Sequence, residues 1–169
     1  MKNQRMLDEL TELMRIDVSS GQETEIAEHL VKKLEQMGFA ITRDEAGATF
    51  GGVCGNILAV REGERDGVVC FCSHMDRVPG GIGIKPVEED GILRSSGDTI
   101  LAADDLSGVA AILEGVRQAI ESGKALPKLE ILFTVGEEAG LYGAKAFDVS
   151  LLTSKRCMCS TPRDASAEL

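Results

Sequence analysis

Apolar residues recur along the chain at two kinds of spacing, one typical of helices and the other of strands. The helical spacing predicts helices over residues 3–15, 26–37, 107–123 and 141–147. Short and nearly continuous apolar runs predict strands over residues 39–42, 57–60, 68–73 and 129–135. Because strands alternate with helices, we expect an α/β fold with a mostly parallel, mixed sheet flanked by helices.

Small polar residues and glycines mark where these elements begin and end. Ser20 followed by Glu23 is a capping-box pattern, which predicts the start of the second helix. Ser107 is expected to cap the third helix through its hydroxyl oxygen. Residues 47–55 are rich in glycine and are expected to form a loop, and residues 89–91 are expected to form a turn.

The composition fits one domain of ordinary size without nucleic-acid or membrane partners. The chain has 169 residues, and its 28 acidic and 18 basic side chains give a net charge of -10. Such an acidic protein is poorly suited to binding phosphate backbones. No apolar run approaches the ~20 residues of a membrane span, and the first residues do not resemble a signal peptide. We therefore expect a cytoplasmic protein.

The five cysteines form two close pairs and one single residue, Cys54. An odd number without the spacing of a disulfide framework indicates reduced thiols, as in a cytosol. Cys70 and Cys72 lie on a predicted strand and are expected to be small apolar core residues. Cys157 and Cys159 could form half of a zinc site, but no second pair of cysteines or histidines follows, so we expect no metal there.

Polar side chains gather at three places where predicted strands end or helices begin. These clusters are residues 73–76 (Ser-His-Met-Asp), 103–105 (Ala-Asp-Asp) and 136–138 (Gly-Glu-Glu). In open α/β sheets, ligands bind at the carboxyl ends of the strands. Several carboxylates that converge there repel one another unless a cation or protons compensate them. One imidazole together with several carboxylates is a ligand set that suits zinc or a similar divalent ion.

Each cluster taken alone has a structural alternative. His74 could be a buried core histidine, Asp104 and Asp105 could cap a helix, and the glutamate pair could be a solvated first turn. The metal-site interpretation therefore depends on the three clusters lying together. In that case one glutamate of the pair can bind metal while the other acts as a general base.

The same residues resemble the motifs of one enzyme family. Residues 73–76, Gly-Asp-Thr-Ile-Leu-Ala-Ala-Asp-Asp at 97–105 and Phe-Thr-Val-Gly-Glu-Glu-Ala-Gly-Leu at 133–141 resemble the dinuclear zinc family of peptidase T, acetylornithine deacetylase and glutamate carboxypeptidase. Agreement is best with the peptidase T (tripeptide aminopeptidase) branch, which segments 13–21 and 143–145 also resemble. The resemblance runs from about residue 5 to 152.

The resemblance implies the N-terminal portion of a zinc-exopeptidase-like catalytic domain that hydrolyses the amide bonds of short peptides with two zinc ions. It implies that His74 binds one zinc, that Asp104 bridges both ions, and that Glu138 binds the second. Glu137 would be the general base, and Asp76 would orient His74. Asp76 and Glu137 are thus the implied catalytic residues.

The chain also departs from the family's pattern. The family usually has Thr, Gly and Lys where this chain has Arg77, Ala102 and Leu106. In the family two further ligands follow, an Asp soon after the glutamate pair and a distant His, with an inserted lid domain between them that often serves in dimerisation. This chain has no histidine after His74. We therefore expect an incomplete dinuclear site, no lid, no dimerisation through a lid, and little activity from this chain alone.

We accordingly expect residues 1–152 to be the N-terminal part of a metallopeptidase catalytic domain and residues 153–169 to be an aberrant tail. From Lys155 the composition changes abruptly, without strand or helix periodicity. If the reading frame is shifted one nucleotide upstream, the codons for this stretch can encode Val-Tyr-Val-Leu-Asp-Ala-Ala-Gly. That sequence resembles the family's next strand and its ligating Asp. A frameshift is our hypothesis for the change, and a genuine short tail is the alternative.

Other functions fit parts of the sequence. A deacylase of the same family, acting on acetylornithine or succinyl-diaminopimelate, is the alternative enzyme, although such enzymes typically have Met-Lys after the bridging Asp. A non-catalytic remnant is the alternative outside the enzyme class, and it would hold little zinc. Residues 80–83 (Gly-Gly-Ile-Gly) lack the spacing and the following helix of a phosphate-binding loop.

Overall fold

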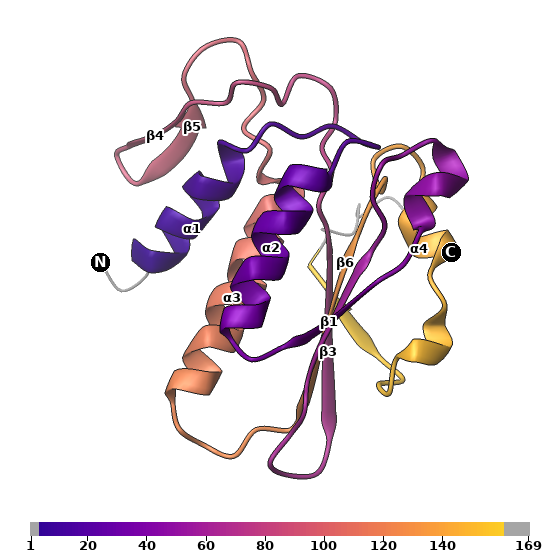
Figure 1. Cartoon of the computed structure of the whole chain (residues 1–169). Helices are drawn as coiled ribbons and strands as arrows, with labels where there is room; N and C mark the ends of the chain where they lie inside the picture. Colours follow the sequence, from indigo (N-terminus) through magenta and orange to yellow (C-terminus); the bar gives the residue numbers. More distant parts are fainter. Residues whose placement is uncertain (1–3, 161–169) are drawn as a thin grey trace, which may run out of the picture.

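A central sheet separates two groups of helices in the computed structural model, which describes residues 4–160 (Figure 1). The sheet has the strand order β1-β2-β6-β3-β7, with bounds Ala40–Arg43, Ile57–Arg61, Lys128–Thr134, Val68–His74 and Cys157–Cys159. Three helices pack on one face: α1 (Gln4–Met14), α2 (Thr24–Gln36) and α3 (Ala103–Glu121). The opposite face carries α4 (Tyr142–Ala146) and the short 3-10 helix η2 (Val149–Leu151).

The strand directions confirm the predicted mixed, mostly parallel sheet. Strand β3 pairs in parallel with both β6 and β7, whereas β2 runs antiparallel to β6 and to β1. Of the five strands in this sheet, β2 alone therefore runs against the others. The register places His74, the last residue of β3, opposite Thr134, the last residue of β6. The segments that follow these two strands consequently start side by side at one edge of the sheet.

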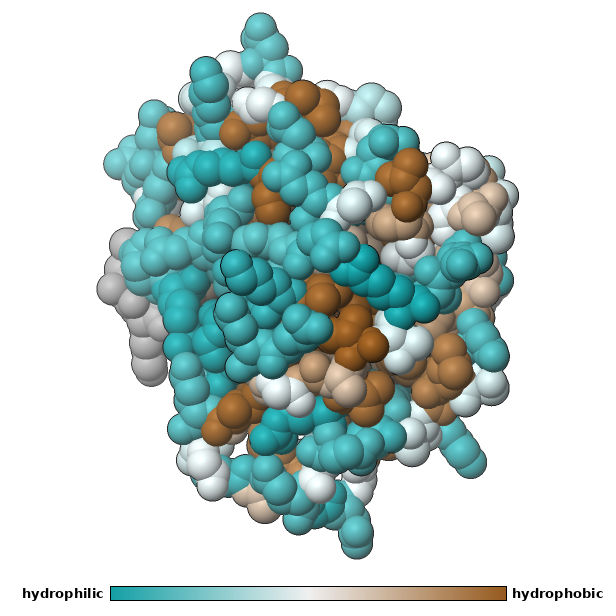
Figure 2. Space-filling model, viewed as in Figure 1, coloured by the Kyte–Doolittle hydropathy of each residue, from teal (hydrophilic) through white to brown (hydrophobic). Residues whose placement is uncertain are grey.

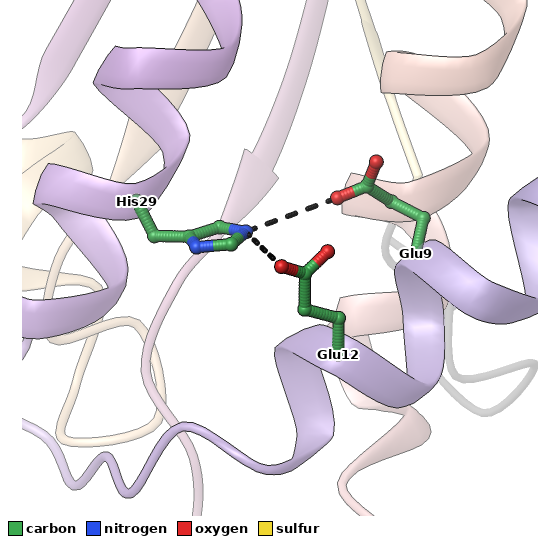
Figure 3. Close-up of side chains that lie close together, drawn as sticks. All are labelled: Glu9, Glu12 and His29. Carbon is green, nitrogen blue, oxygen red and sulfur yellow. Dashed lines mark ion pairs between the residues drawn. The ribbon is translucent and has the colours of Figure 1, made fainter.

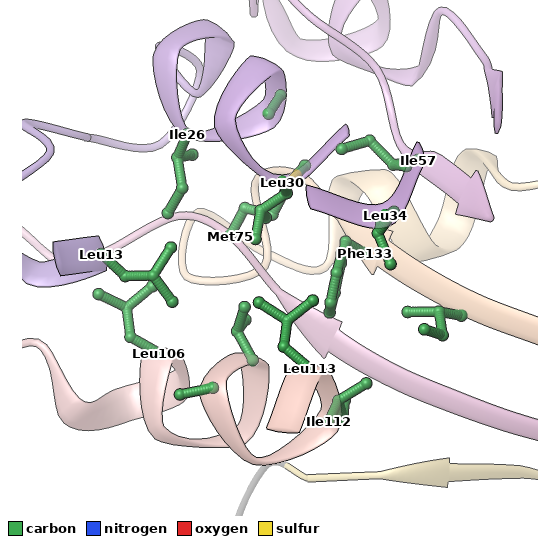
Figure 4. Packing of buried hydrophobic residues seen from close by; sticks show 14 of the residues in the cluster. Leu13, Ile26, Leu30, Leu34, Ile57, Met75, Leu106, Ile112, Leu113 and Phe133 are labelled. Carbon is green, nitrogen blue, oxygen red and sulfur yellow. The ribbon is translucent and has the colours of Figure 1, made fainter. Parts of the chain in front are cut away.

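The main core lies between the sheet and the three long helices. Figure 4 shows Leu30 of α2 and Leu113 of α3 close to Phe133 of β6, with Leu13 of α1 beside Leu106 of α3. All five are fully buried. Burying a side chain of this kind stabilises a fold by about 1.5–3 kcal/mol. This packing holds α3 against the sheet and thereby fixes the position of its first residues, which lie near the polar edge.

A smaller cluster on the other face holds the chain that leads to β7. Leu58 and Leu132 pack there against Phe147. Glu130, also on this face, is fully buried, and its carboxylate accepts hydrogen bonds from the backbone N–H groups of Thr153 and Ser154 at 2.8 and 3.0 Å. The segment that leads into β7 is therefore anchored to β6, next to the place where β7 pairs with β3.

The remaining strands form a hairpin apart from the central sheet, and the surface is mostly hydrophilic on the face shown in Figure 2. Strands β4 (Pro86–Glu89) and β5 (Ile92–Ser95) form a separate hairpin around the predicted turn. On the face shown in Figure 2, hydrophilic side chains cover most of the surface, and apolar side chains emerge in separate patches. Between residues 4 and 160, no helix is both long enough and apolar enough to cross a membrane.

Arg77, one of the departures from the family's pattern, is a buried structural residue. Its guanidinium donates to the backbone carbonyl oxygens of Leu13, Met14 and Gly81 at 2.7, 3.4 and 2.9 Å. Leu13 and Met14 end α1, where unsatisfied carbonyls carry partial negative charge. Burial lowers the pKa of Arg77 to about 10. The side chain thus stabilises the end of α1.

Helices α1 and α3 are joined by a clamp of charged side chains. Arg5 of α1 donates from two nitrogens to the Glu114 carboxylate, each at 2.8 Å, and also pairs with the exposed Glu121. The Arg5 hydrogen bond, with help from Gln118, lowers the pKa of Glu114 from 4.5 to about 2. The bidentate geometry makes this pair stronger than an ordinary surface ion pair.

We expect Glu114→Gln to lower the midpoint of thermal unfolding at neutral pH. Because the pKa of Glu114 is lower in the folded chain than in the unfolded one, its stabilisation is present above about pH 4.5 and is lost as the pH falls towards 2. Thermal unfolding followed by circular dichroism should therefore show a deficit that shrinks on acidification. Glu121→Gln, at the exposed partner, should have a smaller effect, and a deficit independent of pH would contradict the account.

The two predicted helix caps are wrong. Ser20 does not cap α2, because its hydroxyl donates to the carboxylate of Asp76 at 2.5 Å. Ser107 lies inside α3, where its hydroxyl donates to the carbonyl of Ala103. The Asp105 carboxylate instead accepts the N–H of Gly108 at 3.2 Å. A long-range contact overrides the local pattern at Ser20, whereas Ser107 bonds within its own helix because α3 begins four residues earlier than predicted.

Two segments expected to be irregular contain short regular elements. Part of the predicted loop forms the 3-10 helix η1 (Ala46–Phe50). The segment from Lys155, predicted to lack strand structure, contains β7, because backbone pairing with β3 makes a short edge strand without any apolar alternation. The rest of the predicted tail, residues 161–169, lies outside the described residues.

Candidate metal centre

Three of the predicted site residues converge at the polar edge of the sheet. His74 ends β3, Glu138 follows β6, and Asp104 lies at the start of α3. One ligand atom from each of these side chains lies within 4.8 Å of the ligand atoms of the other two. The three residues are distant in the sequence, and the parallel pairing of β3 with β6 brings two of them together. The predicted convergence is thus present in the structure.

The imidazole of His74 is held from one side and faces carboxylates on the other. Nδ1 lies 3.2 Å from the backbone carbonyl oxygen of Asp76 and 3.4 Å from its Oδ1. Nε2 lies 3.3 Å from Oδ1 of Asp104 and 3.8 Å from Oε2 of Glu137. A hydrogen bond donated by Nδ1 leaves Nε2 available to a cation. Asp76 therefore lies behind the ring, where the sequence placed it.

The charge around His74 favours a positive group at this position. Burial alone would lower the pKa of His74, but the hydrogen bond with Asp76 and the charges of Glu137 and Asp105 outweigh it and raise the pKa to about 9. Burial and the neighbouring carboxylates Glu137 and Asp104 raise the pKa of Glu138. The cluster thus carries negative charge that a proton or a metal ion would compensate.

Asp76 connects the imidazole of His74 with the glutamate pair through one fully buried carboxylate. Oδ1 accepts the N–H of Glu137 at 2.9 Å, and Oδ2 accepts the N–H of Glu138 at 3.1 Å as well as the Ser20 hydroxyl. Burial by itself would raise the pKa of Asp76, but these hydrogen bonds and that with His74 lower it. The ionised carboxylate therefore fixes both the imidazole and the backbone of the glutamate pair.

Two supporting residues, Ser20 and Glu23, were missed as site residues by the sequence analysis. The buried Glu23 carboxylate accepts the N–H groups of Gly21 and Gly136 at 2.9 and 3.0 Å, directly before the glutamate pair. Burial raises the pKa of Glu23 more than these hydrogen bonds lower it. Both residues belong to the pattern interpreted as a capping box. The sequence pattern that contains them is therefore one that a helix cap explains equally well.

Asp105 is a structural neighbour of the site. Its buried carboxylate accepts hydrogen bonds from the hydroxyls of Ser73 at 2.7 Å and of Ser160. It thereby ties the start of α3 to the end of β3, and Asp104 is held facing His74. Asp105 thus contributes to the position of Asp104 without facing the ligand cluster itself.

The turn that carries the glutamate pair requires glycine at position 136. Gly136 has φ of +58°, and a Cβ atom there would lie 2.5 Å from Cζ of Phe50, whose ring stacks on Tyr142. Space and backbone conformation both exclude a side chain. The close approach of Phe50 therefore shapes the turn.

We expect Gly136→Ala to destabilise the fold by about 2 kcal/mol, because it combines overpacking with an unfavourable backbone conformation. The matched control is Gly115→Ala in α3, where an added Cβ meets nothing within 4 Å. That control should be neutral or stabilising by about 0.5–1 kcal/mol. Urea unfolding of the two variants checks the difference, and equal stabilities would contradict the described turn.

A cavity of about 400 Å³ opens beside the ligand cluster. Asp104 and Glu138 line its polar side, and Val78, Ile100 and Leu101 line its apolar side. A partly apolar pocket next to converging polar groups is the usual form of a small-molecule site.

A second group of potential ligands, Glu9, Glu12 and His29, does not fit a metal ion. Figure 3 shows the two carboxylates directed at Nε2 of His29, and both distances are 3.9 Å. The ammonium of Lys33, however, lies 2.7 Å from a carboxylate oxygen of each glutamate. A cation therefore already compensates these charges, whereas no lysine or arginine ion-pairs with the described cluster around His74.

The donor set of the first cluster does fit a divalent metal. It offers one imidazole nitrogen and carboxylate oxygens, with a second carboxylate oriented behind the imidazole, as in many zinc sites. Residues 56–157 match peptidase family M28. The chain belongs to peptidase family M28.

Two solved structures share the fold of this M28 chain, and a further relative is similar in sequence. The solved structure of aminopeptidase PepT from Bacillus cereus ATCC 10987 is 37% identical to it, with a TM-score of 0.91 over 95% of this chain and 43% of that chain. A tripeptidase from Staphylococcus aureus subsp. aureus Mu50 is 33% identical, with a TM-score of 0.89 and coverage of 95% and 43%. The uncharacterised protein YqjE of Bacillus subtilis (strain 168) is 37% identical over 91% of this chain and 42% of its own length.

These comparisons confirm the resemblance to peptidase T-like enzymes and the α/β fold that it implied. The chain spans less than half the length of these relatives. The roles of His74, Asp104, Glu138, Glu137 and Asp76 remain predictions.

Proposed function

We propose that this chain forms part of a zinc-dependent peptidase that hydrolyses short peptides. The observation that carries the proposal is the convergence of His74, Asp104 and Glu138 within 4.8 Å, with the Asp76 carboxylate behind the imidazole. Membership of a peptidase family and the likeness to a tripeptidase support it. On this proposal, residues 1–152 belong to one metallopeptidase catalytic domain.

The proposed metal ligands are His74, Asp104 and Glu138. Zinc at this position would polarise the scissile carbonyl and make a water molecule more acidic. Asp76 holds the imidazole of His74 so that Nε2 faces Asp104, and it holds the backbone of Glu138. These are the positioning functions that a preorganised metal site needs.

Glu137 is the proposed general base. Its side chain lies on the Nε2 side of His74, at 3.8 Å, and is 24% exposed. Its backbone is pinned by Asp76, while its carboxylate accepts no hydrogen bond from another described residue. It is therefore free to take a proton from water and to deliver it to the leaving amine. The cavity beside Asp104 and Glu138 would receive the peptide.

The three proposed ligands do not fill two zinc sites, so we expect the 169-residue chain alone to hydrolyse peptides poorly. A chimera avoids this obstacle: residues 1–152 of this chain replace the corresponding segment of aminopeptidase PepT from B. cereus, the structurally similar relative. The chimera should hydrolyse a tripeptide when supplied with zinc. Glu137→Gln in the chimera should lower kcat by at least about 100-fold while zinc remains bound. A folded chimera whose activity is unchanged by this substitution would contradict the proposed role.

A further inference from the structure

Strands β3 and β7 bring four cysteines together that are far apart in the sequence. Cys70 is paired in register with Cys157, and Cys72 with Cys159. Residues two apart on a strand point to the same face of a sheet. Because the two strands are parallel and these residues are paired in register, the side chains of both pairs share one face of the sheet. We call these four residues the thiol ladder.

The ladder is placed where small molecules can reach it. Cys70 is buried and Cys157 is half-buried, whereas Cys159 is exposed. A groove of about 610 Å³ runs along this end of the two strands, and Cys70, Lys155 and Arg156 are among the residues that line it. The groove therefore reaches the Cys70 side of the Cys70–Cys157 pair.

The cysteines are paired across the two strands, which favours a disulfide over a metal site. A zinc thiolate site needs its ligands around one ion at about 2.3 Å. Among the described residues, however, no three cysteine sulfurs lie within 4.8 Å of one another. Neighbouring strands lie about 4.8 Å apart, within the usual Cα separation of about 4.4–6.8 Å in disulfides. The in-register pair of Cys70 and Cys157 therefore needs only a small adjustment to form a bond.

We propose that Cys70 and Cys157 form a reversible intramolecular disulfide when the chain meets a peroxide. In the first step the Cys157 thiolate attacks one oxygen of hydrogen peroxide, the O–O bond breaks, and Cys157 sulfenic acid and hydroxide are formed. In the second step the Cys70 sulfur attacks the sulfenic sulfur, the S–O bond breaks, and hydroxide takes up the thiol proton as water. The two thiols lose two electrons together, and a dithiol reductant returns them.

The electrostatics of the ladder support Cys157 as the attacking sulfur. Hydrogen bonds from the thiols of Cys70 and Cys72 hold the pKa of Cys157 well below its ordinary value. The hydrogen bond to Cys157 and burial raise the pKa of Cys70, which fits a partner that reacts second. The inference depends neither on the proposed peptidase function nor on how residues 153–169 arose.

The test treats the full chain with hydrogen peroxide, blocks the remaining thiols, and digests it with trypsin. Peptides 66–77 and 157–163 each carry one pair of ladder cysteines. They should be recovered as one linked species, and fragmentation should place the bond between Cys70 and Cys157. Dithiothreitol should release both peptides. A bond between chains, a Cys72–Cys159 bond alone, or Cys157 sulfinic acid without linkage would overturn the proposal.

Three variants separate the steps. Cys157→Ser should abolish the link and slow peroxide consumption by about tenfold, whereas Cys54→Ser, outside the ladder, should change neither. Cys70→Ser should leave a sulfenic acid on Cys157 that dimedone traps, which keeps the test informative if Cys157→Ser folds poorly. Unchanged peroxide consumption by a folded Cys157→Ser chain, or no dimedone adduct in Cys70→Ser, would contradict the mechanism.

Discussion

Replacing His74 with alanine is expected to weaken zinc binding by more than about 100-fold, because it removes the one imidazole among three proposed ligands. The chain contains one other histidine, His29, which gives a matched control. His29→Ala should leave zinc affinity within about twofold of the unaltered chain, since Lys33 already occupies the carboxylates beside it. Competition with a zinc-sensitive dye measures both affinities.

The same pair of variants separates the two clusters of potential ligands. If His29→Ala weakened zinc binding as much as His74→Ala, the group formed by Glu9, Glu12 and His29 would be a metal site, and our interpretation of Lys33 would be wrong. If neither substitution changed the zinc affinity, zinc would be bound elsewhere, and the cysteines would be the first alternative ligands.

Asp76→Ala is expected to be the most destabilising substitution at the site. It leaves the N–H groups of Glu137 and Glu138 without their acceptor and removes the charge beside His74. Breaking a buried charge pair of this kind costs about 3–5 kcal/mol, and loss of such a supporting carboxylate lowers metal affinity by about 10–100-fold. Urea unfolding and zinc titration measure the two effects.

Ser20→Ala is the graded control for this prediction, because it removes a single hydrogen bond from the same carboxylate. We expect it to cost about 1 kcal/mol and to change zinc affinity only slightly. An Asp76→Ala chain that folds and binds zinc as well as Ser20→Ala would show that Asp76 does not organise the centre.

The elements of this fold follow from local patterns, but their order in the sheet does not. Apolar spacing predicted the three long helices and strands β1, β2, β3 and β6 to within a few residues. Nothing in that spacing indicates that β2 lies between β1 and β6, because strand order depends on long connections. Strand β7 escaped prediction for a related reason: its stability comes from pairing with β3 rather than from its own side chains.

The site shows the same division between local and long-range information. Recurring motifs indicated His74, Asp104 and Glu138, and the parallel neighbours β3 and β6 explain why they meet. Ser20 was misread, because a hydroxyl three residues before a glutamate predicts a cap, whereas its actual partner is 56 positions away. The thiol ladder was equally invisible, since only the register of β3 with β7 joins its two halves.

X-ray absorption at the zinc edge of the zinc-loaded chain tests the central claim most directly. The account predicts nitrogen and oxygen neighbours at about 2.0–2.2 Å and an imidazole signal that is lost in His74→Ala and retained in His29→Ala. Sulfur neighbours at about 2.3 Å, or an imidazole signal that survives His74→Ala, would contradict it.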